Sequence, residues 1–189
     1  MYQIVFGTLQ VLENNTKFEQ EIEGLDQLQA VYEKALKQEA DNAKQFAKAH
    51  EKESIIYTMA SGANYGVAYS YSICILMEMQ WIHSHAIHAG EYFHGPFEII
   101  DESVPFIILL GLDETRPLEE RALTFSKKYG KKLTVLDAAS YDFTAINDSV
   151  KGYLAPLVLN RVLRSYADEL AEARNHPLSH RRYMWKVEY

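Results

Sequence analysis

One carboxylate stands out as a group that could do chemistry. Glu78 ends a run, residues 65–77, that carries no charge, and a histidine-rich segment follows it. A carboxylate among large apolar side chains is disfavoured in its charged form, so we expect its pKa to be raised towards neutrality. Such a group can take and return a proton near pH 7, which makes Glu78 a candidate general base. The alternative is that Glu78 lies on the solvent side of its helix, because Met77 and Met79 do not indicate which side is wet.

His94 is the candidate partner of this base. It stands immediately before Gly95-Pro96, in a predicted turn from which its ring can project into a cleft. A neutral imidazole at such a position can donate and accept protons. The other histidines of the segment are interpreted as packed or hydrogen-bonded residues, and they are His83, His85 and His88.

The same segment allows a metal site as an alternative. His85 and His88 have the i, i+3 spacing of two ligands on one helix face, and so do His88 and Glu91. The motifs H-E-x-x-H and H-x-x-E-H are both absent, however. Gly90 and Gly95 also disfavour a continuous helix through the segment. We therefore predict that it holds no metal.

The rest of the chain alternates between predicted helices and strands. Strands are predicted at 54–60, 104–110 and 132–136, and helices at 1–12, 24–50, 115–130 and 153–174 and in the run that ends at Glu78. The tail, 175–189, is predicted to be an extended arm. This alternation argues for a parallel sheet with helices on both faces.

A glycine-containing turn joins the first predicted strand to the helix that carries Glu78. A strand, a glycine turn and a helix present backbone N–H groups to an anionic or polar ligand at the carboxyl edge of a sheet. Ser61, Gly62 and Tyr65, in and after this turn, are therefore candidate substrate-binding residues. The pattern G-x-G-x-x-G is absent, so the turn does not predict a dinucleotide cofactor.

The composition excludes several classes of protein. The net charge of -7 and the pI of about 5.5 argue against a nucleic-acid surface or an anionic membrane as the main partner. The single cysteine, Cys74, leaves no disulfide framework and fits a reducing cytoplasm. Residues 2–12 are too short and too mixed for a membrane span, and no basic-then-apolar leader opens the chain. We therefore expect a soluble, cytoplasmic protein.

Several segments resemble a known family of sugar-phosphate enzymes. Residues 76–96, L-M-E-M-Q-W-I-H-S-H-A-I-H-A-G-E-Y-F-H-G-P, resemble the second sugar-isomerase (SIS) domain of the glucosamine-6-phosphate synthase group. In that group a glutamate ends the helix and a histidine follows sixteen residues later, and these fall on Glu78 and His94. Residues 90–100 and 176–187 are most similar to the C-terminal half of the fructoselysine 6-phosphate deglycases. The resemblance implies a three-layer α/β/α SIS fold with a parallel sheet, long N-terminal helices before it and an extended tail after it.

The resemblance also implies a reaction. Deglycases of this family convert an amino acid carried on C1 of fructose 6-phosphate into glucose 6-phosphate and the free amino acid. His94 is then expected to assist opening of the sugar ring. Glu78 is expected to take a proton from C1 and return it at C2, after which water hydrolyses the C1 imine. No metal or other cofactor is needed, because the imine nitrogen and the C2 carbonyl accept the electrons.

Two further expectations come from the synthases of the same group. Their catalytic histidine belongs to the neighbouring subunit, so a homodimer with shared active sites is implied. Their C-terminal arm carries a lysine that reaches the sugar, and the similar segment 182–186 makes Lys186 a candidate substrate-binding residue.

The chain departs from the family at one point. The phosphate-binding loop of the first SIS domain, S-x-S-G-x-[ST], is absent, and residues 61–63 match only a fragment of it. We therefore expect a C-terminal piece: residues 1–50 end a missing first domain and form a linker, 51–174 are a SIS domain, and 175–189 close over the active site. The alternatives are a sugar-phosphate aldose–ketose isomerase and a non-catalytic sugar-phosphate-binding regulator.

Overall fold

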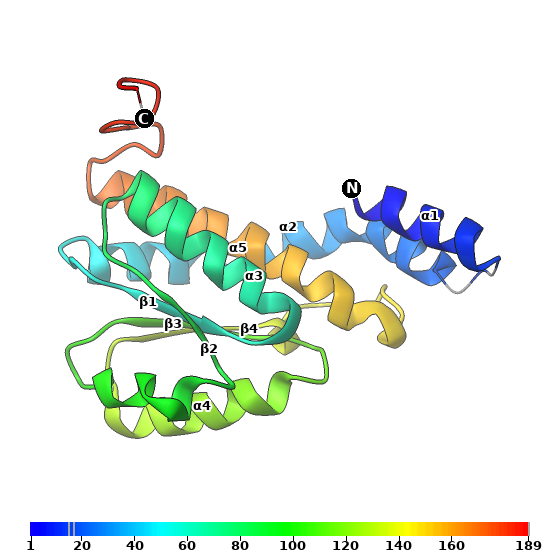
Figure 1. The fold of residues 1–189 in the computed structure, drawn as a ribbon, viewed down its shortest axis with the longest axis horizontal. Helices are drawn as coiled ribbons and strands as arrows, with labels where there is room; N and C mark the ends of the chain where they lie inside the picture. Colours follow the sequence, from blue (N-terminus) through cyan, green and yellow to red (C-terminus); the bar gives the residue numbers. More distant parts are fainter. Residues whose placement is uncertain (15, 17, 189) are drawn as a thin grey trace.

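The computed structural model describes residues 1–14, 16 and 18–188 (Figure 1). The helices are α1 (Tyr2–Glu13), α2 (Glu19–His50), α3 (Gly62–Ser70), the π-helix η1 (Tyr71–Met79), α4 (Arg116–Tyr129) and α5 (Lys151–Ala173). The strands are β1 (Tyr57–Ala60), β2 (Ala86–His88), β3 (Phe106–Leu110) and β4 (Leu133–Asp137). Short 3-10 turns are η2 (Tyr92–His94), η3 (Pro96–Ile99), η4 (Ala138–Ser140) and η5 (Asp148–Val150).

The four strands form one parallel sheet in the order β2-β1-β3-β4. Helices α2, α3 and α5 cover one face, and α4 covers the other (Figure 1). The predicted three-layer α/β/α arrangement is therefore confirmed. In β3, Ile107 and Leu109 join the core on the α5 side, whereas Ile108 and Leu110 join the core on the α4 side. A strand buried on both faces must be apolar at every position, which explains its continuous apolar run.

The longest helices, α2 and α5, pack closely against each other. A Cβ atom added at Gly24 of α2 would lie 2.6 Å from Cδ1 of Leu154 in α5, so the absence of a side chain permits this approach. Helix α2 begins at Glu19, five residues before the start that the sequence suggested at Gly24. Glu19 and Glu21 lie in its first turn, where negative charge is favourable.

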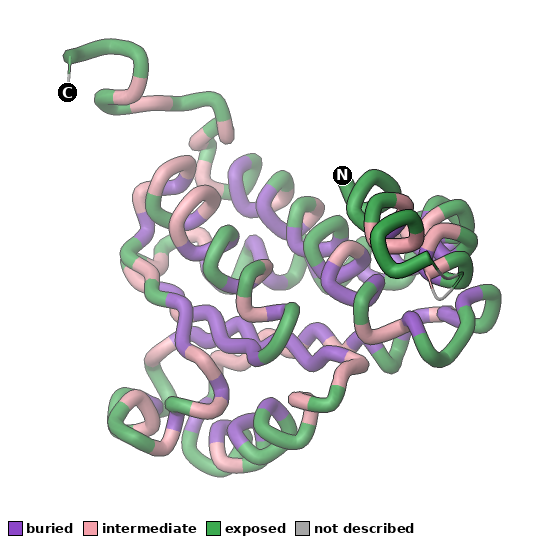
Figure 2. The backbone as a smooth tube through the Cα atoms, turned by 45° about the vertical axis from the view of Figure 1, so that its right-hand side comes forward, coloured by how far each residue is buried: buried purple, intermediate pink, exposed green. Residues whose placement is uncertain are grey.

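Two other elements differ from the sequence-based expectation. No strand was predicted in the histidine-rich segment, yet Ala86–His88 forms the edge strand β2, paired with β1. The helix that leads to Glu78 continues beyond α3 as a π-helix. Residues 175–188 of the tail form neither helix nor strand, as expected, and they are mostly exposed beyond the end of α5 (Figure 2).

Candidate active site

Glu78 is placed by the wide turns of the π-helix η1. The backbone N–H of Gln80 donates to the carbonyl of Ile75, a spacing of five residues, at the end of this helix. Tyr71 and Leu76 are buried in the core and fix the inner side of the helix. Short π-helical stretches occur frequently at functional sites, because they turn side chains away from the ordinary helical positions.

The Glu78 carboxylate is half-buried and ion-paired. Its side chain is 26% exposed, and its Oε1 lies 3.2 Å from Nη2 of Arg181 in the tail, whose side chain is 11% exposed. The sequence suggested a carboxylate among large apolar side chains, and the local sequence could not show the distant arginine that pairs with it. The arginine is itself held by hydrogen bonds from Nη1 to the carbonyls of Leu178 and His180, at 2.6 and 3.0 Å.

A cavity of about 540 Å³ lies between the end of η1 and the tail. Its walls include Glu78, Trp81, His83, Arg181, Arg182 and Met184. Its volume falls in the range of small-molecule sites, and its walls combine a carboxylate, two guanidinium groups and an aromatic ring. Such a lining suits a polar, charged small molecule.

Lys186 belongs to the same tail. Its Nζ donates to the carbonyl of Arg181 at 2.6 Å, and its side chain is exposed. The ammonium group thus holds the turn of the tail that brings Arg181 to Glu78. It is not among the residues that line the cavity.

His94 lies on the other side of the sheet. It ends η2, whose Tyr92 and Phe93 pack in the core on the α4 side, whereas Leu76 before Glu78 packs on the α5 side. Its ring is 72% exposed, and Nδ1 lies 3.4 Å from Oε2 of Glu91. Within one chain, therefore, Glu78 and His94 do not meet, and His94 does not line the Glu78 cavity.

The other histidines differ from their predicted roles. His83 and His85 have exposed side chains, so the expectation that they are packed is wrong. Their backbones extend the pairing with the β1 segment, where the carbonyl of His85 accepts from the N–H of Thr58. His88 fits the expectation, because its Nδ1 accepts from the N–H of Gly90 at 3.1 Å. Among the described residues, no three His, Cys, Asp or Glu side chains are grouped so that they could hold a metal.

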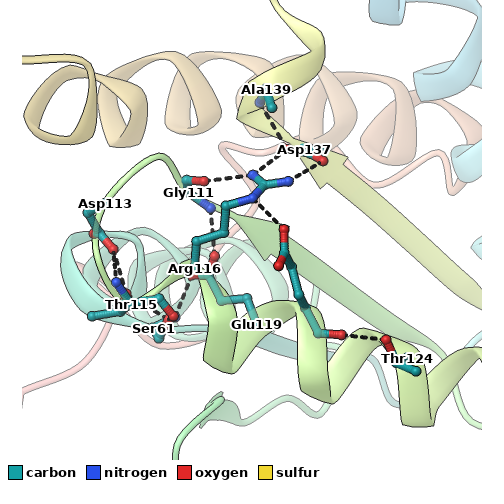
Figure 3. A network of polar contacts seen from close by, with 10 residues as sticks. Ser61, Gly111, Asp113, Thr115, Arg116, Glu119, Thr124, Asp137 and Ala139 are labelled. Carbon is teal, nitrogen blue, oxygen red and sulfur yellow. Dashed lines mark hydrogen bonds and ion pairs between the residues drawn. The ribbon is translucent and has the colours of Figure 1, made fainter. Parts of the chain in front are cut away.

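The β1–α3 turn is closed by side chains of the chain itself (Figure 3). The Ser61 hydroxyl donates to Oγ1 of Thr115 at 2.9 Å, and the Ser61 N–H donates to Oε1 of Glu119 at 2.9 Å. Ser61 is fully buried. Burial raises the pKa of Glu119, although the N–H groups of Gly111 and Ser61 oppose the shift. The hydroxyl and N–H of Ser61 are therefore already satisfied within the protein.

A carboxylate also occupies the N-terminus of α3. Oδ2 of Asp113 accepts from the N–H of Ala63 at 3.3 Å. Gly62 has a φ of 50°, and an added Cβ would lie 2.6 Å from that Oδ2, so this approach requires glycine. A smaller cavity of about 360 Å³ at this edge is lined by Gly62 and by three acids, Asp113, Glu114 and Asp148. Their charge disfavours a phosphate group here.

The candidate substrate-binding residues Ser61, Gly62 and Tyr65 therefore lie at a place of their own. Tyr65 lies near the turn, where its hydroxyl donates to the carbonyl of Ala86 at 3.4 Å and its ring contacts His88. The continuous helix from Gly62 to Met79 separates this turn from Glu78 by about 25 Å. Ser61, Gly62 and Tyr65 thus do not share a small-molecule site with Glu78 in one chain.

Three residues of the Glu78 cavity were not assigned from the sequence. They are Trp81, Arg181 and Arg182. The adjacent arginines form the one Arg-Arg pair in a sequence of net charge -7, and this was the signal available.

None of the described helices is both long enough and apolar enough to cross a bilayer.

Comparison with known proteins gives this geometry a context. Fructosamine deglycase FrlB of Bacillus subtilis is 98% identical over 189 residues, which are all of this chain and 58% of that protein. Fructoselysine 6-phosphate deglycase of Escherichia coli K12 is 33% identical over 143 residues, which are 76% of this chain and 41% of that protein. The chain therefore spans about half the length of these curated relatives.

The fold of the chain is also similar to that of a solved structure. A Bacillus subtilis protein assigned provisionally to the phosphosugar isomerases has a TM-score of 0.98 and 98% identity, over all of this chain and 57% of its own. No protein-family model matches the chain.

Proposed function

The chain has the phosphosugar isomerase (SIS) fold, and we propose that it carries the proton-transfer residues of a deglycase that acts on Amadori sugar phosphates. In these compounds an amino acid is joined through nitrogen to C1 of fructose 6-phosphate. The observation that supports this proposal most directly is the Glu78 carboxylate in the wall of a 540 Å³ cavity lined by charged groups. The names of the relatives, a fructosamine deglycase and a fructoselysine 6-phosphate deglycase, support the same chemistry.

Glu78 is the base in this proposal. It takes a proton from C1 of the open-chain substrate, and the C1–H electron pair forms a C1–C2 double bond while the C2 carbonyl oxygen takes a proton from solvent. Glu78 then returns its proton to C2, the nitrogen lone pair forms a double bond to C1, and the nitrogen gives its proton back to solvent. Water adds to this imine and releases the amino acid and glucose 6-phosphate. A half-buried carboxylate at the end of a rigid helix suits both transfers.

His94 completes the site from a second copy of the chain. Its exposed ring lies on the opposite face of the sheet from the π-helix, and among the described residues it pairs with Glu91. An exposed proton carrier that does not reach its own Glu78 suits a homodimer with shared active sites. There it assists opening of the sugar ring by moving a proton at the ring oxygen.

The substrate phosphate binds away from the β1–α3 turn. Asp113 and its acidic neighbours disfavour an anion there, so another part of the protein anchors the phosphate. We propose that residues 1–50 link the SIS domain, 51–174, to that part, and that 175–189 close over the site. The side chains of Ile4, Val11 and Leu12 in α1 are 70%, 80% and 75% exposed, which suits a helix that packs against a further domain.

The compartment proposed is the cytoplasm, and the state is a homodimer. The unpaired Cys74 suits a reducing environment, and sugar phosphates are intracellular metabolites. Lys186 contributes by shaping the tail through the Arg181 carbonyl.

The test measures release of amino acid and glucose 6-phosphate from a fructosamine 6-phosphate by the full-length protein. Glu78→Gln is expected to lower turnover by about 100-fold or more while substrate binding persists. Glu33→Gln is the matched control, because this exposed carboxylate on α2 contacts Gln29 and lies outside the cavity. Near-normal turnover by Glu78→Gln refutes the assignment of Glu78 as the base.

The same assay separates the alternatives. An aldose–ketose isomerase interconverts fructose 6-phosphate and glucose 6-phosphate, and no amine is released. A non-catalytic regulator binds the sugar phosphate and converts neither compound. Either result contradicts the proposed deglycase activity and supports the corresponding alternative.

A further inference from the structure

The second arginine of the tail has no task in the mechanism above. Arg182 lies beside the Glu78 cavity and lines it, and its side chain is exposed. Its guanidinium carbon lies 4.1 Å from the centroid of the Trp81 ring. No hydrogen bond or ion pair links Arg182 to another described residue. Arg181 differs, because it is engaged by Glu78 and by backbone carbonyls.

The ring under Arg182 is itself fixed. Trp81 has a φ of 55°, a conformation that is rare for a bulky residue. Its ring contacts the His176 ring at 4.5 Å and the His180 ring at 5.1 Å between centroids. Backbone strain of this kind persists where the surroundings determine a conformation that serves a site. A stacked guanidinium loses little freedom on binding, and its N–H edge stays available to a planar anion.

The neighbouring His176 does not compete for that anion. Burial lowers the pKa of His176, and the nearby His180 ring and the cations Arg174 and Arg182 act in the same direction. His176 therefore stays neutral at physiological pH. Among the described residues that line this wall of the cavity, Arg182 is left as the cation without an ion pair.

We propose that Arg182, stacked on Trp81, binds the carboxylate of the amino acid that the substrate carries. This inference rests on the proposed function, because the amino acid is the part of the substrate beyond the sugar phosphate. Glu78 acts at C1, and the amine nitrogen is bonded to C1, so the amino acid begins beside Glu78, in the cavity that Arg182 also lines. Guanidinium and carboxylate groups form two parallel hydrogen bonds, which makes arginine the favoured residue for this recognition.

The experiment compares two substrates that differ in the carboxylate alone. Fructoselysine 6-phosphate has the group, and the equivalent adduct of 1,5-diaminopentane lacks it. We expect the wild-type full-length protein to prefer the first by about 10- to 100-fold in kcat/KM. In Arg182→Gln the ratio of the two kcat/KM values is expected to fall to nearly one. Arg182→Lys keeps a charge without the two-pronged geometry and is expected to retain an intermediate preference.

Arg121→Gln provides the matched control. Arg121 is also an exposed arginine above an aromatic ring, 4.3 Å from the Phe93 centroid, but it lies on α4 away from the cavity. This variant is expected to keep the wild-type preference. An Arg182→Gln enzyme that loses activity equally on both substrates, or on neither, overturns the proposal.

A binding measurement keeps this inference separate from the proposed function. In a Glu78→Gln background, calorimetry gives the affinity for each substrate without turnover. A carboxylate-dependent affinity that disappears in Glu78→Gln/Arg182→Gln supports the subsite even where no amine is released in any assay. Equal affinities for the two compounds in the Glu78→Gln background overturn it even where the deglycase reaction is found.

Discussion

The guanidinium of Arg181 lies 3.2 Å from the carboxylate of Glu78, and this contact joins the tail to the end of the π-helix. Both groups are mostly shielded from solvent, at 11% and 26% exposure. The position of the proposed base and the order of the tail are therefore linked. A substitution at either residue is therefore expected to change the position or the order of the other.

Glu78→Gln is expected to loosen the tail. Loss of the charge weakens an ion pair worth about 1 kcal/mol at such exposure, so opening of the tail becomes about fivefold more frequent. Hydrogen exchange measured by mass spectrometry on amides 176–187 reports this opening. Glu33→Gln, at an exposed carboxylate on α2, is expected to leave the exchange unchanged. Equal exchange in Glu78→Gln and the wild type contradicts the linkage.

Mixing two inactive variants tests the shared site. Glu78→Gln and His94→Asn homodimers are each expected to be inactive. If Glu78 and His94 come from different copies, a heterodimer of the two variants contains one intact site and one doubly altered site. Random exchange of subunits in an equal mixture then restores about a quarter of wild-type activity. The measurement is turnover after subunit exchange, with the unmixed variants as controls, and absence of recovery contradicts shared sites.

Elements with a strong local signal were predictable from the sequence. The uninterrupted apolar run of β3 indicated a doubly buried strand, and Gly130 after α4 indicated the end of that helix. Strand β2 was missed because it has three residues and follows two exposed histidines, a pattern without alternation. The π-helical turn at Glu78 could not be predicted, because a π-helix has no characteristic period in the sequence.

The sequence suggested single residues for the site, but not their arrangement. Glu78 and His94 were proposed from their chemical type and a familiar spacing. Within one chain the fold places them on opposite faces of the sheet, so only a site shared between two copies could bring them together. The glycine turn likewise suggested an anion site, but Asp113 comes from the distant β3–α4 loop and fills it. Contacts between residues far apart in the sequence depend on tertiary packing, which local patterns do not contain.

Arg116 at the carboxyl edge of the sheet is expected to contribute strongly to stability. Its Nη1 and Nη2 donate to Oδ1 and Oδ2 of Asp137, both at 2.8 Å, and Nη1 also donates to the carbonyl of Gly111 (Figure 3). Burial acts to raise the pKa of Asp137, but hydrogen bonds from Arg116 and from the N–H of Ala139 outweigh it and lower the pKa. The pair therefore stays charged and joins α4 to β4.

Arg116→Gln is expected to lower the free energy of unfolding by about 2 kcal/mol, because it leaves a half-buried carboxylate without its partner. Arg164→Gln is the matched control, since Arg164 and Asp168 form a pair on α5 at 3.4 Å with side chains 46% and 57% exposed. That variant is expected to cost less than about 0.5 kcal/mol. Urea denaturation gives both values, and equal losses in the two variants contradict the role of Arg116.

His50 makes the folded protein less stable in mild acid. The side chain is buried at the end of α2, and its Nδ1–H donates to the Phe46 carbonyl at 2.8 Å. Burial lowers its pKa below the ordinary value of about 6.5, although the hydrogen bond to Phe46 and the charge of Glu53 oppose the shift. Between these two pKa values the unfolded chain binds a proton that the folded protein does not bind. The free energy of unfolding therefore falls as the pH drops below 6.5.

Denaturation at a series of pH values from 8 to 5 measures this dependence. The wild type is expected to lose stability below pH 6.5, and His176 contributes in the same direction because its pKa is also lowered. His50→Gln removes the titrating group, so its stability is expected to fall less steeply over the same interval, whatever its stability at pH 8. His85→Gln, at an exposed histidine, is the control for removal of an imidazole. Identical slopes in the wild type and His50→Gln exclude His50 as the source.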